Sequence, residues 1–154
     1  MNYLKGLLKV MRIPMGYYIV ALLLFIILLI VLKNWCISFL GSYGFLVLAK
    51  TLIHRTPTQS SSYNLNLFWS YSQWRSEWWQ IVSNILMFIP IGLVGAEWKS
   101  RKGLLYAVLF SILIEVLQFI THRGLFEFDD MLNNTLGSLI GFSLYLLIKK
   151  IRIS

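Results

Sequence analysis

Charged residues are scarce in this 154-residue chain, in which Asp, Glu, Lys and Arg together make up 13% of the residues. Ordinary soluble domains carry about 25%. The chain has one cysteine, Cys36, which excludes an internal disulfide and a metal site built on paired cysteines. Internal repeats are also missing, and a monomeric transporter built from inverted repeats is therefore not expected.

Hydrophobic residues make up 58% of the chain, and its mean hydropathy is +0.71. Aromatic residues contribute 16%, as expected where aromatic belts mark two membrane interfaces. A helix needs about 20 apolar residues to cross about 30 Å of hydrocarbon. The segments that meet this requirement are about Pro14–Leu32, Trp35–Ile53, Trp78–Ala96, Leu104–Thr121 and Met131–Ile148. The sequence therefore predicts an all-α, polytopic membrane bundle of about five helices, a single domain over 1–154 with an extra N-terminal hairpin over 14–49.

The net charge of +8 comes from Lys and Arg residues that flank the apolar runs, the pattern of topology signals and lipid contacts. We therefore expect membrane lipids as partners and no nucleic acid. Lys5, Lys9 and Arg12 precede the first run as in a signal peptide, but that run is too long for one, and we expect a retained helix. The positive charges divide equally between the two sides. Because the side with Lys99–Lys102 and Lys149–Arg152 has the tightest clusters, we assign it to the cytoplasm.

The segment 54–77 joins the second and third predicted helices and is rich in both polar and aromatic residues. Its aromatic content is too high for a free linker, so we expect it to lie on the membrane surface or to fold over the bundle. Five spans place it on the same side as the loop 122–130, and the two can meet. Arg55, Asn64 and Asn66 are candidate ligand-binding residues in this segment. Turn formation is the alternative for the two asparagines.

Glu115 lies in the middle of the fourth apolar run. A carboxyl at the bilayer centre costs roughly 3 kcal/mol, and such residues are candidates for function. Ser111, Glu115, Gln118 and His122 fall on one helix stripe. A structural ion pair or a protonated, buried carboxyl is the alternative for Glu115. We interpret His122 as a helix-end residue.

The third predicted helix carries Gln80 and Asn84 one turn apart. They either face a polar cavity or link helices by hydrogen bonds worth roughly 0.6 kcal/mol on average. The fifth helix begins near Asp129 and Asp130, followed by Asn133 and Asn134. A helix N-cap explains one of these aspartates but not the whole group.

Gly137 and Gly141 follow on the same stripe of the fifth helix. Small residues four apart let another backbone approach closely. We expect this helix to pack on the third or fourth, with its carboxylates at a shared polar site. A homodimer through these two glycines is a further prediction.

Five sequence pieces occur in order: Arg55; Asn64-Leu-Asn66-Leu-Phe68; Asn84-Ile-Leu-Met-Phe-Ile-Pro90-Ile-Gly92; Ser111 through Glu115 to Gln118; and Asp129-Asp130-Met-Leu-Asn133-Asn134-Thr-Leu-Gly137. Over residues 50–148 this pattern resembles the VanZ-like family. The resemblance implies a multi-pass protein of the bacterial cell membrane that lowers susceptibility to teicoplanin-class lipoglycopeptides. It also implies a set of ligand-binding positions: Arg55, Asn64, Asn66, Asn84, Glu115, Gln118, Arg123, Asp129, Asp130 and Asn133.

Two functions fit these residues. The first is binding of a lipid or lipid-linked cell-wall precursor headgroup, or of the lipoglycopeptide itself, where the third, fourth and fifth helices meet. The second is an intramembrane enzyme acting on a phospholipid or polyprenyl phosphate, with Asp129 and Asp130 holding a divalent metal as in aspartate-rich motifs. Glu115, Asp129 and Asp130 are the catalytic candidates in that case, but we assign no catalytic residue. No cofactor and no metal ligand are predicted.

Overall fold

A computed structural model describes residues 13–58, 62–99 and 101–153. The predicted cluster of Lys5, Lys9 and Arg12 lies outside these residues. Five helices are long and apolar enough to cross a membrane. They are built from α2 (Met15–Leu32), α3 (Trp35–Leu48) with its π-helical extension η1 (Ala49–Ile53), α5 (Trp74–Lys99), α6 (Arg101–Ile120) and α7 (Phe128–Ile153). The predicted all-α membrane bundle is therefore confirmed, and several helices run longer than predicted.

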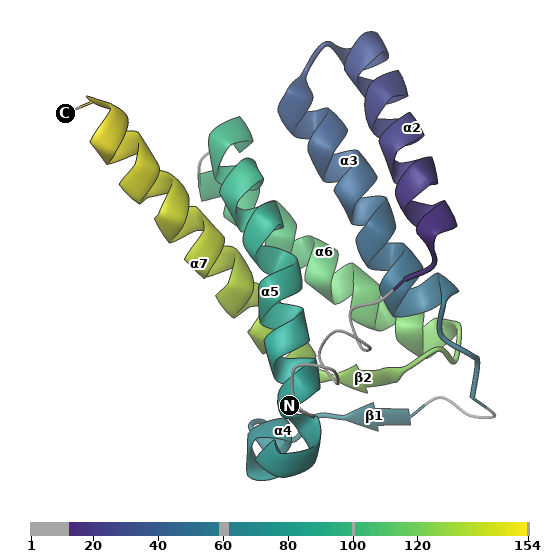
Figure 1. Ribbon diagram of the computed structural model, residues 1–154. Coiled ribbons are helices and arrows are strands. Elements are labelled where there is room, and N and C mark those ends of the chain that lie inside the picture. The colour runs from purple at the N-terminus through teal and green to yellow at the C-terminus, as the bar shows by residue number, and fades with distance from the viewer. Residues whose placement is uncertain (1–12, 59–61, 100, 154) are drawn as a thin grey trace, which may run out of the picture.

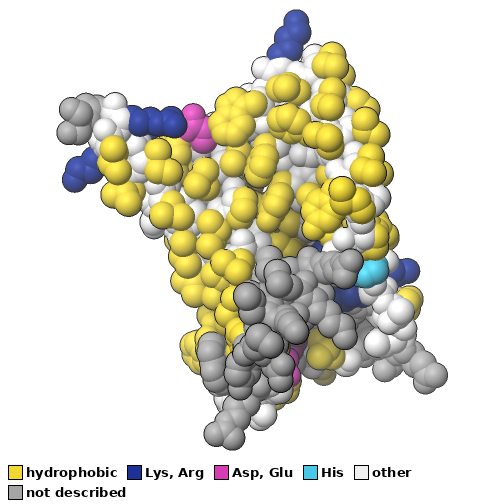
Figure 2. Space-filling view, in the orientation of Figure 1, with side chains coloured by type: hydrophobic (Ala, Val, Ile, Leu, Met, Phe, Trp, Pro, Cys, Tyr) yellow, Lys and Arg dark blue, Asp and Glu magenta, His cyan; other side chains and the backbone are white. Residues whose placement is uncertain are grey.

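The helices α2 and α3 form a tight hairpin at the edge of the bundle (Figure 1). Lys33 ends α2 in the left-handed conformation, and its N–H donates to the Leu29 carbonyl. Asn34 then caps α3 by accepting the Ile37 N–H at 3.1 Å. Ala21 is the one buried residue of α2, so this helix presents almost its whole surface outward. Figure 2 shows hydrophobic side chains over most of the visible face of the bundle, as a lipid-facing surface requires.

Two short strands and a one-turn helix cover one end of the bundle (Figure 1). They are β1 (Ser62–Asn64), α4 (Trp69–Ser72) and β2 (Leu125–Glu127). The strands pair in parallel, with Ser62 opposite Leu125 and Asn64 opposite Glu127. This pairing confirms that the segments 54–77 and 122–130 share a face and meet. We call β1, α4 and β2 the cap. The strands were not predicted, because three residues are too few to show an alternating pattern.

Close backbone contact joins α5 and α7. A Cβ added at Gly137 would lie 2.2 Å from the Ile85 carbonyl oxygen, and one added at Gly141 would lie 2.1 Å from that of Ile89. On the opposite helix, Gly92 faces the backbone of Ser138 in the same way. The packing predicted for the fifth helix is confirmed, with α5 as its partner. The homodimer through these glycines stays a prediction, in which the second copy would have to share a surface that α5 already occupies.

Replacing Gly137 by alanine is expected to destabilise the bundle. The new methyl group would overlap the Ile85 carbonyl, and overpacking of this kind costs about 1–3 kcal/mol. Gly16→Ala is the matched control, since nothing lies within 4 Å of its Cβ position and alanine favours a helix. Thermal unfolding in detergent measures both variants. A Gly137→Ala protein that melts with or above the control would contradict the close contact.

Candidate functional site

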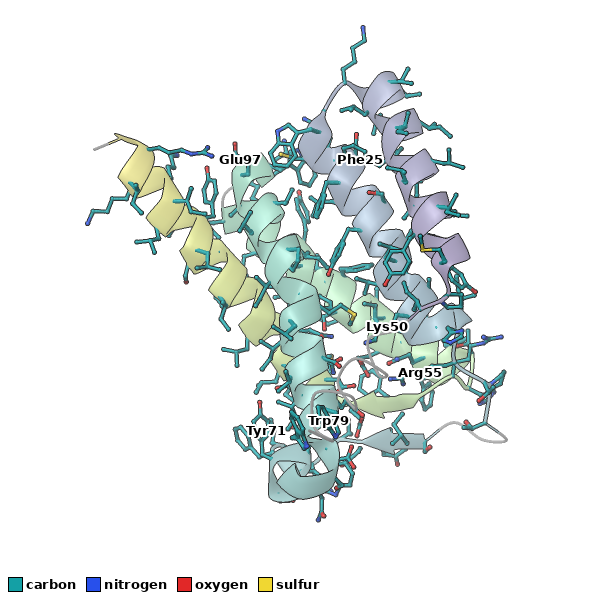
Figure 3. All side chains as sticks on the ribbon, in the orientation of Figure 1. Phe25, Lys50, Arg55, Tyr71, Trp79 and Glu97 are labelled. Atoms are coloured by element: carbon teal, nitrogen blue, oxygen red, sulfur yellow. The ribbon has the colours of Figure 1, made fainter. Side chains whose placement is uncertain are left out.

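The polar side chains of α5, α6 and α7 gather beneath the cap. Figure 3 shows Lys50, Arg55 and Trp79 at this end of the bundle, with Tyr71 in the cap itself. This is the end of the bundle at which α6 finishes and α7 begins. The polar residues that are almost fully buried there come from the two loops, from the second half of α6 and from the first two turns of α7. They are Ser70, Ser111, Glu115, Gln118, Glu127, Asp129, Asp130, Asn133 and Asn134.

Asp129 ties α7 to the cap. One carboxylate oxygen accepts the Phe68 N–H at 2.7 Å. The other accepts the Ser70 N–H at 2.9 Å and the Ser70 hydroxyl at 2.7 Å. Phe68 adopts a left-handed conformation directly before α4, which turns these N–H groups toward the carboxylate. The Asp129 side chain therefore holds the start of α4 and makes its hydrogen bonds there, not in the first turn of its own helix.

Gln80 links two other carboxyl groups. Its Nε2 atom donates to Glu127 at 2.6 Å and to both oxygens of Asp130 at 3.1 and 3.0 Å. Asn84, one turn further along α5, is a second hydrogen-bonding neighbour of Asp130. The predicted amide pair on α5 is thus brought against α7 and β2. Both alternatives considered for it remain open, because these hydrogen bonds also join helices.

Glu115 accepts the backbone N–H of Glu127 at 3.0 Å, and only 1% of its surface is exposed. Glu115, Glu127 and Asp130 form a cluster of three neighbouring carboxyl groups, which we call the carboxyl cluster. The positive charge of the Arg55 guanidinium attracts each of these three carboxyl groups. It lies against Gly124, where a Cβ would be 2.8 Å from Arg55 Nη1. The structure therefore brings Arg55 and Glu115 together, although 60 positions separate them.

Three predicted residues have other partners. The Arg123 guanidinium donates to the carbonyl oxygens of Leu52, Ile53 and Arg55 at 3.0, 2.9 and 2.9 Å, which satisfies the end of η1. Asn64 accepts the Asn66 N–H at 3.1 Å, as the turn alternative predicts. Asn66 is exposed. These contacts give the three residues structural roles in the loops around the carboxyl cluster.

Three buried amide atoms have no hydrogen-bond partner within the described residues: Gln118 Oε1, Asn133 Nδ2 and Asn134 Oδ1. The other amide atom of each side chain is engaged. Gln118 donates to the Thr51 carbonyl at 3.1 Å, Asn134 donates to Ser111 at 2.9 Å, and Asn133 accepts from the Tyr71 hydroxyl. Leaving a buried polar group unpaired costs about 1–3 kcal/mol, so these atoms are candidates for contact with a ligand or water.

Sequence reasoning missed Glu127 and Lys50. Glu127 directly precedes Phe128-Asp129-Asp130, and this density of acidic residues in a chain with six was the available signal. Lys50 lies near the end of the second predicted helix, where a lysine usually extends its amine to the membrane surface. Instead, its Nζ atom is buried and has no hydrogen-bond partner in the described part of the chain. The π-helical turn η1 contains Lys50, and such turns are frequent at functional sites.

The two aspartates of the predicted metal motif have different partners. Asp129 binds the start of α4, whereas Asp130 binds Gln80 of α5. Among the described residues, no group of three or more His, Cys, Asp or Glu side chains is placed to hold a metal ion. The adjacent aspartates therefore do not supply a shared set of donors.

Burial and the neighbouring Asp130 raise the pKa of Glu127 from 4.5 to about 7. Between pH 4.5 and 7 the folded protein therefore keeps a proton that the unfolded chain has released. We expect thermal stability in detergent to fall as pH rises through this window. Glu127→Gln retains an acceptor for Gln80 and is expected to flatten this dependence. An equally steep fall in the variant would show that other groups cause it.

Burial and the nearby Asp129 also raise the pKa of Tyr71. The Tyr71 hydroxyl thus stays protonated and remains a donor to Asn133. This contact connects the cap directly to α7, one turn beyond Asp129.

The sequence model of the VanZ/LLP1 family matches residues 17–149, a range that begins within α2 and includes the N-terminal hairpin. The chain is also similar to Protein VanZ of Enterococcus faecium, with 30% identity over 88 residues. That match covers 54% of this chain, and the chain spans about half (52%) of the length of this relative. No solved structure matches the chain.

Proposed function

The chain belongs to the VanZ-like family, and from this membership we propose that it is a protein of the bacterial cell membrane that lowers susceptibility to teicoplanin-class lipoglycopeptides. Membership of the family supports the role. The five helices able to cross a membrane support the location. Because the similar Enterococcus protein is matched over half of its length, the role is a proposal for this chain.

The proposed mechanism is binding of a lipid or cell-wall precursor headgroup between α5, α6 and α7. The observation that carries it is the set of unpaired amide atoms on Gln118, Asn133 and Asn134, buried beneath the cap. Headgroups of this kind present hydroxyl and amide groups, which pair well with amide side chains. A bound headgroup would shield the precursor from a lipid-anchored antibiotic.

Arg55 supplies the charge that such a headgroup needs. Arg55 is exposed at the edge of the site, and its positive charge acts on each carboxyl group of the carboxyl cluster. An Arg guanidinium matches phosphate and carboxylate groups through paired hydrogen bonds. We propose that Arg55 contacts the phosphate or carboxylate of the headgroup while the amides contact its neutral groups.

Asn133→Leu tests this mechanism. The change keeps the number and branching of the side-chain heavy atoms but removes the unpaired Nδ2 donor and also the Oδ1 acceptor of the Tyr71 hydroxyl, and we expect most of the protection against teicoplanin to be lost. Ser143→Ala is the matched control on the same helix, because Ser143 is exposed and bonds only its own helix at Leu139. Inhibitory concentrations are compared at equal protein levels in the membrane. Full protection by Asn133→Leu would contradict a role for these amides.

The site is expected to face the cell exterior, since the clusters of Lys and Arg at the other end of the bundle favour the cytoplasm. Cys36→Ala removes the one, buried cysteine. In that background, a cysteine placed at the exposed Thr56 should react with a membrane-impermeant maleimide on intact cells. A cysteine at the exposed Lys102 should react only after lysis. The reverse pattern would place the site in the cytoplasm.

A further inference from the structure

A groove of about 510 Å³ lies at the opposite end of the bundle from the cap. Its walls come from the start of α3 and the ends of α5 and α7. The lining residues are Trp35, Leu93, Glu97, Tyr145, Ile148, Lys149 and Arg152. None of them belongs to the candidate site described above.

The groove results from the way α5 and α7 diverge. The two helices touch along Gly92, Gly137 and Gly141, and beyond these glycines α7 leans away from α5 (Figure 1). In that part of the bundle larger side chains replace the glycines and line the groove. They are Tyr145 and Ile148 on α7 and Glu97 on α5. Figure 3 shows Glu97 at the end of α5 that faces the last turns of α7.

The groove combines cationic, aromatic and apolar side chains, which are the kinds that contact the headgroup, the interface and the acyl chains of a phospholipid. Lys149 and Arg152 are cations in the last turns of α7, and Lys149 Nζ lies 5.9 Å from the centroid of the Tyr145 ring. Leu93, one turn before Glu97 on α5, and Ile148 on α7 supply the apolar part of the lining. Trp and Tyr side chains, here Trp35 and Tyr145, are enriched in membrane proteins at the level of the lipid headgroups.

The charge around the groove is also positive. Glu97 offsets one of the two lining cations, but further Lys and Arg residues stand at the same end of the bundle: Lys99, Arg101, Lys102 and Lys150. Basic pockets between membrane helices bind anionic headgroups. A zwitterionic headgroup would gain less from this surface, since its own positive group is repelled.

We propose that this groove binds an anionic phospholipid of the phosphatidylglycerol class. Its phosphate contacts Lys149 and Arg152, its glycerol hydroxyls donate to Glu97, and one acyl chain lies along Leu93 and Ile148. The lipid fills the space between the diverging ends of α5 and α7 and holds α7 in place. This site is separate from the one in the proposed function and does not depend on it.

Native mass spectrometry of the full chain in detergent, with phosphatidylglycerol or phosphatidylcholine added, tests the proposal. Each Lys or Arg near an anionic surface is worth about 1 kcal/mol, so Lys149→Gln with Arg152→Gln should weaken phosphatidylglycerol binding about 30-fold. Lys102→Gln with Lys150→Gln is the matched control, because it removes two charges at the same end of the bundle from residues outside the groove. Because these two residues lie outside the groove, the control should lose clearly less affinity than the groove variant.

Three outcomes would overturn the proposal. The first is equal retention of phosphatidylglycerol by the groove variant and the control. The second is equal retention of phosphatidylcholine by the wild type. The third is a dimer that the groove variant alone disrupts, since a second copy would then be the occupant. Melting temperatures of the lipid-free proteins show whether the groove variant is folded, and the charge-conserving Lys149→Arg should retain binding.

Discussion

Asp129→Ala is expected to cause the largest loss of stability of any single change at the contact between α7 and the cap, about 3–5 kcal/mol. The substitution removes the acceptor of three hydrogen bonds, and it leaves the N–H groups of Phe68 and Ser70 unpaired in a buried setting. In a chain of 154 residues this corresponds to a fall in melting temperature of about 10 °C. Thermal unfolding in detergent is the measurement.

Two milder variants should lower the melting temperature by smaller amounts than Asp129→Ala. Ser70→Ala removes one of the three hydrogen bonds and should cost least. Asp129→Asn keeps one oxygen acceptor but turns an amide donor toward backbone donors, and it should fall between Ser70→Ala and Asp129→Ala. If all three variants melt with the wild type, the cap is not held by Asp129, and this description of the site is wrong.

Glu115→Ala is expected to abolish protection against teicoplanin, whereas Glu115→Gln should keep most of it. Alanine leaves the buried N–H of Glu127 without an acceptor at a cost of about 1–3 kcal/mol, and strand β2 then loses this hydrogen bond to α6. Glutamine still offers an oxygen at the same position. Inhibitory concentrations of the two variants, measured at equal protein levels in the membrane, separate these outcomes.

The pair of Glu115 variants also distinguishes binding from catalysis. A site that only binds needs the hydrogen bond and tolerates glutamine. An enzyme that moves a proton through Glu115 would lose activity with either variant. Loss of protection by a well-folded Glu115→Gln protein would therefore contradict the binding mechanism and favour turnover of a lipid substrate.

The sequence predicted the membrane helices well because hydropathy over about 20 residues is a strong signal. It also predicted that Gly137 and Gly141 would meet another helix, since small residues four apart have few other uses within a membrane. The contact partner, α5, was one of two candidates. Sequence spacing alone does not determine which neighbour a helix stripe faces.

The detailed chemistry of the site was harder to predict. Glu127 belongs to the carboxyl cluster and lies in β2, which pairs with β1. Strands of three residues leave no periodic pattern in a sequence, so this placement could not be predicted. Arg123 stays a predicted ligand-binding residue, and the structure adds that its guanidinium donates to carbonyl groups at the end of η1. Such roles depend on which backbone atoms a fold leaves unpaired, and they are apparent only in three dimensions.

The inhibitory concentrations of teicoplanin and vancomycin in a susceptible Gram-positive host that expresses this protein test the central claim most directly, with Glu115→Ala as the control. The proposed function predicts a rise for teicoplanin alone, and this rise should disappear in the variant. An unchanged teicoplanin value, with the protein shown to be in the membrane, would contradict the proposed role.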